Sequence, residues 1–164
     1  MIRNARPGDL PGIQALYAQA RRFMADNGNP TQWAGGYPQE DMLQKDIARG
    51  ELFVIEEESL WGAFAFIIGE DPTYLRIEEG RWLSDSPYGT IHRLAGDGKT
   101  RGILGRAVAF CEARIPHLRI DTHPDNAVMR HLIPKYGFRE CGIIYQPDGT
   151  PRIAYEKLGD GEEA

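Results

Sequence analysis

The residues best suited to chemistry lie in a glycine-rich segment, Gly96-Asp97-Gly98-Lys99-Thr100-Arg101-Gly102-Ile103, between a strand-like run and a helix-like run. Glycines let a backbone approach a ligand closely, and the free amides at the start of a helix attract anions. Lys99 and Arg101 add positive charge in a chain of net charge −5, so a phosphate or pyrophosphate is the expected ligand. The alternative is a plain tight turn into a helix. The spacing matches neither a P-loop nor the Gly-x-Gly-x-x-Gly pattern of dinucleotide sites.

A second polar segment, Asp121-Thr122-His123-Pro124-Asp125-Asn126, begins at the C-terminal end of another strand-like run. Open α/β sheets bind ligands at the C-terminal ends of their strands, so this segment is a second candidate for the site. In the alternative interpretation, Asn126 only caps the next helix and Asp121 supports a turn. The sequence leaves both interpretations open.

Together the two segments resemble the GNAT superfamily of acetyl-CoA-dependent N-acetyltransferases. The family's pyrophosphate loop runs Arg/Gln-x-x-Gly-x-Gly/Ala, and this sequence has Lys99-Thr100-Arg101-Gly102-Ile103-Leu104. The family's downstream pattern, Asn-x-x-Ala-x-x-Leu-Tyr-x-x-x-Gly-Phe, is similar in spacing to residues 126–138. Residues 2–13 look like the family's opening strand and helix. The resemblance covers nearly the whole chain, and it depends on the spacing of the three motifs together.

The elements that must position these segments can be predicted from hydrophobic periodicity. Helices are expected after a cap at Asp9, after Pro38, from Thr100 to Pro116 and after Asn126, with Pro134 distorting the last of them. Strands are expected over residues 2–5, 52–55, 60–68, 90–95, 118–122, 141–145 and 153–155, and residues 74–77 could form another. This order predicts a mixed α/β sheet with helices on both faces. The resemblance implies a mostly antiparallel sheet of six to seven strands flanked by about four helices, in one domain over residues 1–158 with a frayed acidic tail over 159–164.

The resemblance also implies where acetyl-CoA binds. Pantetheine would lie in a gap beside the strand of residues 90–95, the amides from Lys99 to Leu104 would hold the pyrophosphate, and a strand amide would stabilise the oxyanion. The residues expected to contact the cofactor are Leu94, Ala95, Gly96, Lys99, Thr100, Arg101, Gly102, Ile103, Leu104 and Asn126. The implied reaction is direct attack by a primary amine of a small molecule or peptide, through a tetrahedral intermediate, with coenzyme A as product.

Three positions depart from the family pattern. Lys99 stands where Arg or Gln is usual, and Leu104 replaces a Gly or Ala, which is tolerable if its side chain points into the protein. Ile133 occupies the position of the tyrosine that is held to protonate the departing thiolate, and it has no proton to give. A thiolate with a free pKa of about 8.5 needs only modest help to leave, so the loss is survivable.

The catalytic candidates are therefore two histidines and two other tyrosines. His92 shares a strand face with Thr90 and could take the amine proton through water, and His123 is the second candidate base. Tyr136, three residues after Ile133, or Tyr145 could be the acid. Each has a structural alternative, because a half-buried histidine can bond to a carbonyl and a tyrosine can simply pack with its hydroxyl in water.

The acyl-acceptor pocket is expected to use four aromatic residues in Gly/Pro-rich loops: Trp33, Tyr37, Trp82 and Tyr88. Because Glu78, Glu79 and Asp85 are close to the last two in sequence, the pocket would suit a cationic amine. The alternative is that the tryptophans cover the open edge of the sheet.

Composition excludes several other classes of protein. The 164 residues include 19 Lys and Arg against 24 Asp and Glu, which argues against nucleic acid as a partner. No apolar run approaches the roughly 18 residues of a membrane span, and no signal peptide is visible. Two cysteines make no disulfide framework, and no metal is expected. Composition therefore favours a cytoplasmic protein. Homodimers are usual for the resemblance, but the sequence leaves the oligomeric state open. The resemblance implies an acyltransferase. The alternatives are a non-catalytic acyl-CoA-binding or sensor module and an interaction protein that shares only the fold.

Overall fold

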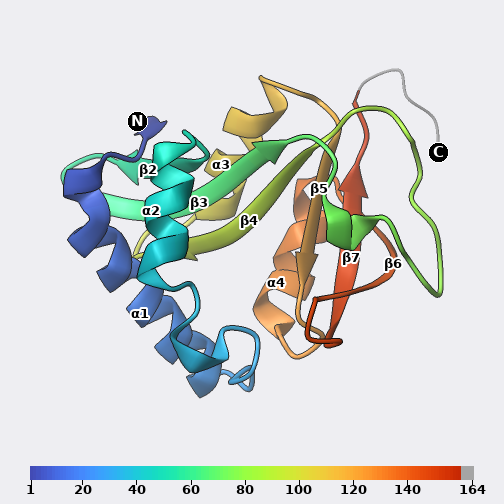
Figure 1. Cartoon of the computed structure of the whole chain (residues 1–164), viewed down its shortest axis with the longest axis horizontal. Helices are drawn as coiled ribbons and strands as arrows, with labels where there is room; N and C mark the ends of the chain where they lie inside the picture. Colours follow the sequence, from blue (N-terminus) through green and yellow to red (C-terminus); the bar gives the residue numbers. More distant parts are fainter. Residues whose placement is uncertain (160–164) are drawn as a thin grey trace. The chain divides into compact units, whose positions relative to one another are not determined.

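The computed structural model describes residues 1–159 and contains, within them, one mixed sheet and four α-helices (Figure 1). The sheet order is β1-β2-β3-β4-β5-β7-β6. The strands are β1 (Ile2–Asn4), β2 (Leu52–Glu56), β3 (Leu60–Ile68), β4 (Gly89–Gly96), β5 (Leu118–Thr122), β6 (Arg139–Tyr145) and β7 (Pro151–Lys157). The helices are α1 (Leu10–Asp26), α2 (Glu40–Ala48), α3 (Ile103–Glu112) and α4 (Ala127–Leu132). The predicted α/β fold class is confirmed. Apart from Gly159, the predicted tail lies outside the described residues.

The chain forms two compact units, which we describe separately. The first contains Met1–Phe66 and His92–Ala107, and the second contains Ile67–Ile91 and the chain from Val108 onward. Strands β3 and β4 and helix α3 each continue from one unit into the other. The single domain expected over residues 1–158 stays a prediction. No helix in the described part of the chain is both long enough and apolar enough to cross a membrane.

In the first unit, β1, β2 and β3 pair antiparallel, with Ile2 opposite Ile55 and Leu52 opposite Ala65. Helices α1 and α2 lie side by side (Figure 1). The buried core draws on α1, α2 and the strands, and includes Ile13, Leu16, Tyr17, Leu43, Val54 and Ala63. The spacing of three and four residues that predicted an amphipathic α1 is therefore confirmed.

Asp9 stands at the N-cap position predicted for α1, but its side chain makes no hydrogen bond that caps this helix. A 3₁₀ turn, Pro7–Asp9, precedes the helix. Its carboxylate instead accepts hydrogen bonds from the Arg3 guanidinium at 2.8 and 3.0 Å and from the Arg6 amide at 2.7 Å. Asp9 thereby joins β1 to the start of α1.

In the second unit, β7 pairs antiparallel with both β5 and β6, and β4 pairs in parallel with β5 at Gly89–Leu118 and Thr90–Arg119. Helix α4 ends at Leu132 and continues as a 3₁₀ turn, Ile133–Tyr136, closed by Gly137 at φ 93°. Pro134 removes a backbone donor from this turn, so the predicted distortion is confirmed.

The strand considered for residues 74–77 is wrong. Pro72–Tyr74 forms a 3₁₀ turn, because the Asp71 side chain accepts from the Thr73 amide at 2.8 Å and starts the turn. The Tyr74 side chain is buried, and its hydroxyl donates to Asp121 at 2.7 Å. Only Glu78 of this region makes a strand-like bridge among the described residues, to Ile143.

Candidate functional site

Arg93, near the middle of β4, has an unusual backbone. Its φ is 51°, in the left-handed region that costs a bulky residue about 1–2 kcal/mol. Such strain tends to be kept at functional sites and must be held by surrounding contacts. Nothing in the sequence around Arg93 signals this conformation, because neither Gly nor Asn stands at the position.

Three side chains of the first unit hold Arg93, and with it we call them the Arg93 cluster: Tyr17, Tyr37 and Asp46. The Tyr17 hydroxyl donates to the Arg93 carbonyl oxygen at 2.6 Å. The guanidinium donates to Asp46 Oδ2 at 2.8 Å and to the Tyr37 hydroxyl at 3.4 Å. Tyr17 is 1% exposed and Asp46 is 4% exposed. Burial raises the pKa of Tyr17, so its hydroxyl remains a donor.

The conformation of β4 decides where its amides point. The Asp97 amide donates to the Trp61 carbonyl on β3 at 2.9 Å. Because successive residues of a strand direct their backbone polar groups to alternate edges, the amides of Leu94 and Gly96 point away from β3. These two cofactor candidates thus keep amides that β3 does not use. Ala95 faces β3, because its carbonyl oxygen would lie 3.0 Å from a Cβ added at Gly62. The geometry therefore does not favour the Ala95 amide as a ligand donor, and its contact with a cofactor stays a prediction.

The loop before α3 needs a correction as well. The Asp97 carboxylate accepts from the amides of Lys99 and Thr100 at 2.8 and 2.7 Å and from the Thr100 hydroxyl at 2.8 Å. Burial acts to raise the pKa of Asp97, but the hydrogen bonds from Thr100 and Lys99 outweigh it and lower the pKa. The amides of Lys99 and Thr100, predicted to hold pyrophosphate, are therefore already bonded within the protein.

The amides of Gly102, Ile103 and Leu104, unlike those of Lys99 and Thr100, are not bonded to Asp97. The Arg106 amide donates to the Gly102 carbonyl, so the amides of Gly102, Ile103 and Leu104 precede the first turn's hydrogen bonds and have no intrahelical acceptor. Gly102 has φ 77°, and a Cβ added there would meet no heavy atom within 4 Å. The backbone is thus open to close approach at this point.

The side chains around these amides suit a phosphate. Leu104 is buried, as the resemblance required, and Ile103 is buried too. Lys99 and Arg101 are exposed and bring two cations to the loop. A helix start with free amides, an open glycine and two exposed cations fits the diphosphate of acetyl-CoA.

The catalytic candidates are spread over the two units. His92 is half-buried on β4, directly before Arg93. Ile133, at the family's tyrosine position, is 0% exposed and apolar, so no proton donor stands there. Tyr136 is half-buried at the end of the 3₁₀ turn. Tyr145 ends β6, and a hydrogen bond with Glu78 raises its pKa.

His123 and Asn126 make local contacts after β5. His123 Nδ1 accepts from the Asp125 amide at 3.0 Å, which leaves Nε2 of the neutral ring as a donor. Burial, and after it the charge of Arg152, lowers the pKa of His123. Asn126 Oδ1 accepts from the Met129 amide at 3.1 Å, so Asn126 caps α4. The capping interpretation of Asn126 is confirmed, whereas its contact with a cofactor stays a prediction.

The four aromatic acceptor candidates are packed within the protein. Trp33 is buried in the core of the first unit, 5.5 Å from the Tyr17 ring and 6.2 Å from the Tyr37 ring between centroids. In the second unit, the Arg119 guanidinium lies 4.0 Å from the centroid of each of the Trp82 and Tyr88 rings. The cation beside these two rings is therefore the protein's own.

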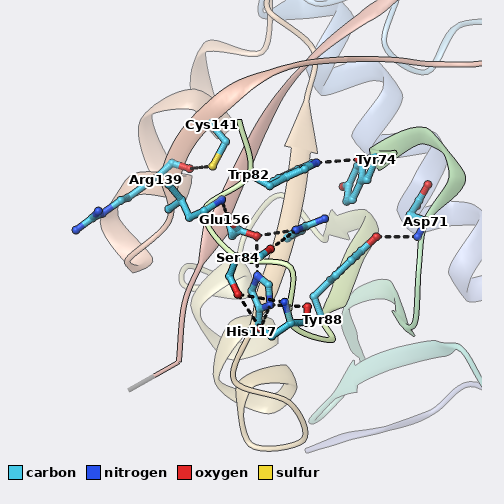
Figure 2. Close-up of polar contacts among 12 residues, drawn as sticks. Asp71, Tyr74, Trp82, Ser84, Tyr88, His117, Arg139, Cys141 and Glu156 are labelled. Atoms are coloured by element: carbon cyan, nitrogen blue, oxygen red, sulfur yellow. Dashed lines mark hydrogen bonds and ion pairs between the residues drawn. The ribbon is translucent and has the colours of Figure 1, made fainter. Parts of the chain in front are cut away.

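Sequence reasoning missed a buried cluster around Glu156 and His117, which are labelled in Figure 2. Arg119 belongs to this cluster. Glu156 Oε2 bonds to the Arg119 Nε at 2.7 Å and to the His117 Nε2 at 2.6 Å, and its Oε1 accepts from the Leu83 amide at 2.5 Å. The His117 Nδ1 lies 2.9 Å from the Ser86 hydroxyl. This cluster fixes residues 83–86 against β5 and β7. Among residues 1–159, no group of three or more His, Cys, Asp or Glu could hold a metal ion.

Comparisons with known proteins agree with the fold. A crystal structure described as an acetyltransferase of the GNAT family from Streptococcus agalactiae 2603 matches at 35% identity, over 98% of this chain and 95% of that one, with a TM-score of 0.85. A GNAT-family acetyltransferase from Listeria monocytogenes 4b F2365 matches at 23% identity, over 96% and 93%, with a TM-score of 0.70. A ribosomal-protein-alanine N-acetyltransferase from Brucella melitensis matches at 20% identity, over 96% and 99%, with a TM-score of 0.60. The last two support the fold alone. No family model and no curated protein matches the chain.

Proposed function

Because the chain belongs to the GNAT family of acetyltransferases, we propose that it transfers an acetyl group from acetyl-CoA to a primary amine of a small molecule or peptide. The observation that carries the proposal is the pair of backbone features in the first unit. Gly102, Ile103 and Leu104 present free amides at the start of α3, and Leu94 and Gly96 keep amides that β3 does not use.

Each feature has a distinct role in the proposed reaction. The α3 amides, with Lys99 and Arg101, hold the diphosphate of the substrate. The amides of Leu94 and Gly96 are donors for the acyl carbonyl oxygen, where negative charge develops as the amine attacks. Donors fixed in a strand need no reorganisation during the reaction, which is why backbone amides suit this role.

Two protons must move. The attacking amine must lose one, and His92 is the candidate that receives it through water, since it directly precedes Arg93 on the same strand. The departing thiolate gains one. Ile133 cannot supply it, so Tyr136, Tyr145 or solvent does so, and a thiol of pKa about 8.5 tolerates this.

Thiol release tests the proposal. The purified protein is incubated with acetyl-CoA and a panel of primary amines that includes small polyamines, amino acids and short peptides, and free thiol is measured with a chromogenic reagent. We expect release that requires both protein and one class of amine. His92→Asn is expected to lower kcat by about two orders of magnitude, as for loss of a general base, with coenzyme A affinity unchanged.

A non-catalytic acyl-CoA-binding module is the second candidate, and the burial of apolar Ile133 at the family's tyrosine position favours it. Calorimetric binding of coenzyme A without thiol release from any amine would support this module and contradict the enzyme. Absence of binding at millimolar coenzyme A would contradict both.

A further inference from the structure

The feature that the proposed reaction leaves unexplained is the convergence of the Arg93 cluster on one strained residue. Tyr17 comes from α1, Tyr37 from the loop before α2 and Asp46 from α2 itself. All three contact Arg93, one through its main chain and two through its side chain. Such a convergence fixes both ends of the residue and leaves its backbone no freedom to relax to an ordinary strand conformation.

The Tyr17 contact has a directional consequence. In a trans peptide, the carbonyl of one residue and the amide of the next point in opposite directions. The hydroxyl that fixes the Arg93 carbonyl at 2.6 Å therefore also fixes the direction of the Leu94 amide. Leu94 is the residue whose amide points away from β3 beside the strained position.

We infer that Tyr17 is a positioning residue: it holds the Arg93–Leu94 peptide so that the Leu94 amide is aimed at the acyl carbonyl oxygen. The inference rests on the proposed function, because only that function provides an acyl carbonyl oxygen to accept a hydrogen bond from the Leu94 amide. Asp46 supports the same arrangement from the other end of Arg93. Tyr17 touches neither substrate and acts only through the peptide.

Tyr17→Phe removes the hydroxyl and keeps the buried ring against Trp33. Tyr74→Phe is the matched control, because it also removes a buried tyrosine hydroxyl bond, 2.7 Å long, from a residue outside the proposed site. We expect Tyr17→Phe to lower kcat by about tenfold or more, as for a misdirected oxyanion donor, with KM for acetyl-CoA changed less than about threefold. Each of the two variants is expected to lower Tm, and by similar amounts, because each loses one buried hydroxyl hydrogen bond. Tyr74→Phe is expected to leave kcat unchanged.

A second measurement is independent of turnover. In ¹⁵N–¹H spectra, the Leu94 amide of the wild type is expected to shift on addition of acetyl-CoA and to shift less with free coenzyme A, which lacks the carbonyl. In Tyr17→Phe, the shift caused by acetyl-CoA should shrink, whereas the shifts of Gly102 to Leu104 should persist.

Two results would overturn the inference: a Tyr17→Phe kcat within twofold of the wild type, or an unchanged response of the Leu94 amide. If the wild type binds acetyl-CoA but acetylates no amine, the proposed function fails, and the Leu94 response still decides the inference by itself.

Discussion

Arg93 combines two costly features, a left-handed backbone and a charged side chain that is only 12% exposed. The Tyr17 hydroxyl stabilises the left-handed backbone by its hydrogen bond to the Arg93 carbonyl oxygen. Asp46 stabilises the charge by its ion pair with the guanidinium. Residues that break a local rule in this way are often those used in function, and they are also the ones a sequence pattern cannot predict. The one available signal was Asp46, a carboxylate that interrupts the apolar face of α2 between Leu43 and Ile47.

The Arg93–Asp46 pair leads to the first prediction. Asp46→Asn leaves a guanidinium in a nearly closed environment without its counter-charge, so we expect the free energy of unfolding to fall by about 3 kcal/mol. Urea unfolding measures this. Asp41→Asn, at an exposed carboxylate of the same helix, is the control and should cost only a few tenths of a kcal/mol. Equal losses in the two variants would contradict the structural role of the pair.

The start of α3 is the element that could be predicted best and was still predicted incompletely. The glycines, the cations and the change of period located the loop, but the role of Asp97 was missed. In an Asx turn, an aspartate carboxylate accepts hydrogen bonds from backbone amides a few residues later in the chain. Asp97 within the glycine-rich loop was therefore a signal for such a turn. Its effect is to move the expected phosphate contacts from Lys99 and Thr100 toward Gly102 to Leu104.

Charge reversal tests α3 as a phosphate-binding element. Arg101→Glu places a carboxylate beside the free amides, so we expect the dissociation constant of coenzyme A to rise by about tenfold or more. This rise corresponds to a loss of at least about 1.4 kcal/mol of binding free energy. Arg114→Glu changes the net charge equally at an exposed position beyond the other end of α3. Calorimetric titration of both variants gives the comparison. Similar losses would show that only net charge matters and would count against the loop.

Elements with local signals were predicted well, and those decided by distant partners were not. The antiparallel strands, α1 and the Asn126 cap followed from periodicity and from cap residues. Residues 74–77 have a strand-like composition, but Asp71 and Pro72 set a turn, and the Tyr74 hydroxyl bonds to Asp121, 47 residues away. No local pattern contains that partner.

At the scale of the whole chain, the cluster of His117, Arg119 and Glu156 could not be predicted from sequence, because Glu156 is far from the other two residues along the chain. Glu156 lies 39 and 37 residues from its two partners and is fully buried in β7. The sequence offered Trp82 and Tyr88 as rings for a cationic acceptor, whereas the structure places Arg119 against both. A cation does lie against these rings, but that the cation is Arg119 of the same chain was not predicted.

Glu156 should control how stability responds to acid. Burial acts to raise its pKa, but hydrogen bonds from His117, Arg119 and the Leu83 amide lower the pKa below its ordinary value of 4.5. The unfolded chain therefore binds more protons near and below pH 4.5, so this contribution is present above that pH and is lost as the pH falls through the folded-state pKa.

Glu156→Gln removes this titration and leaves Arg119 without its counter-charge. We expect a loss of about 3 kcal/mol at neutral pH and a shallower decline in unfolding free energy below about pH 5. Urea unfolding over a pH series measures both effects. Glu140→Gln, at an exposed position on β6, should keep the wild-type slope. A Glu156→Gln slope parallel to that of the wild type would contradict the role of this carboxylate.

A crystal structure of the protein with acetyl-CoA bound tests the central claim most directly. We predict the diphosphate on the amides of Gly102, Ile103 and Leu104 and the acyl oxygen within hydrogen-bond distance of the Leu94 amide. A nucleotide bound elsewhere, with these nitrogens facing only solvent, would contradict the account.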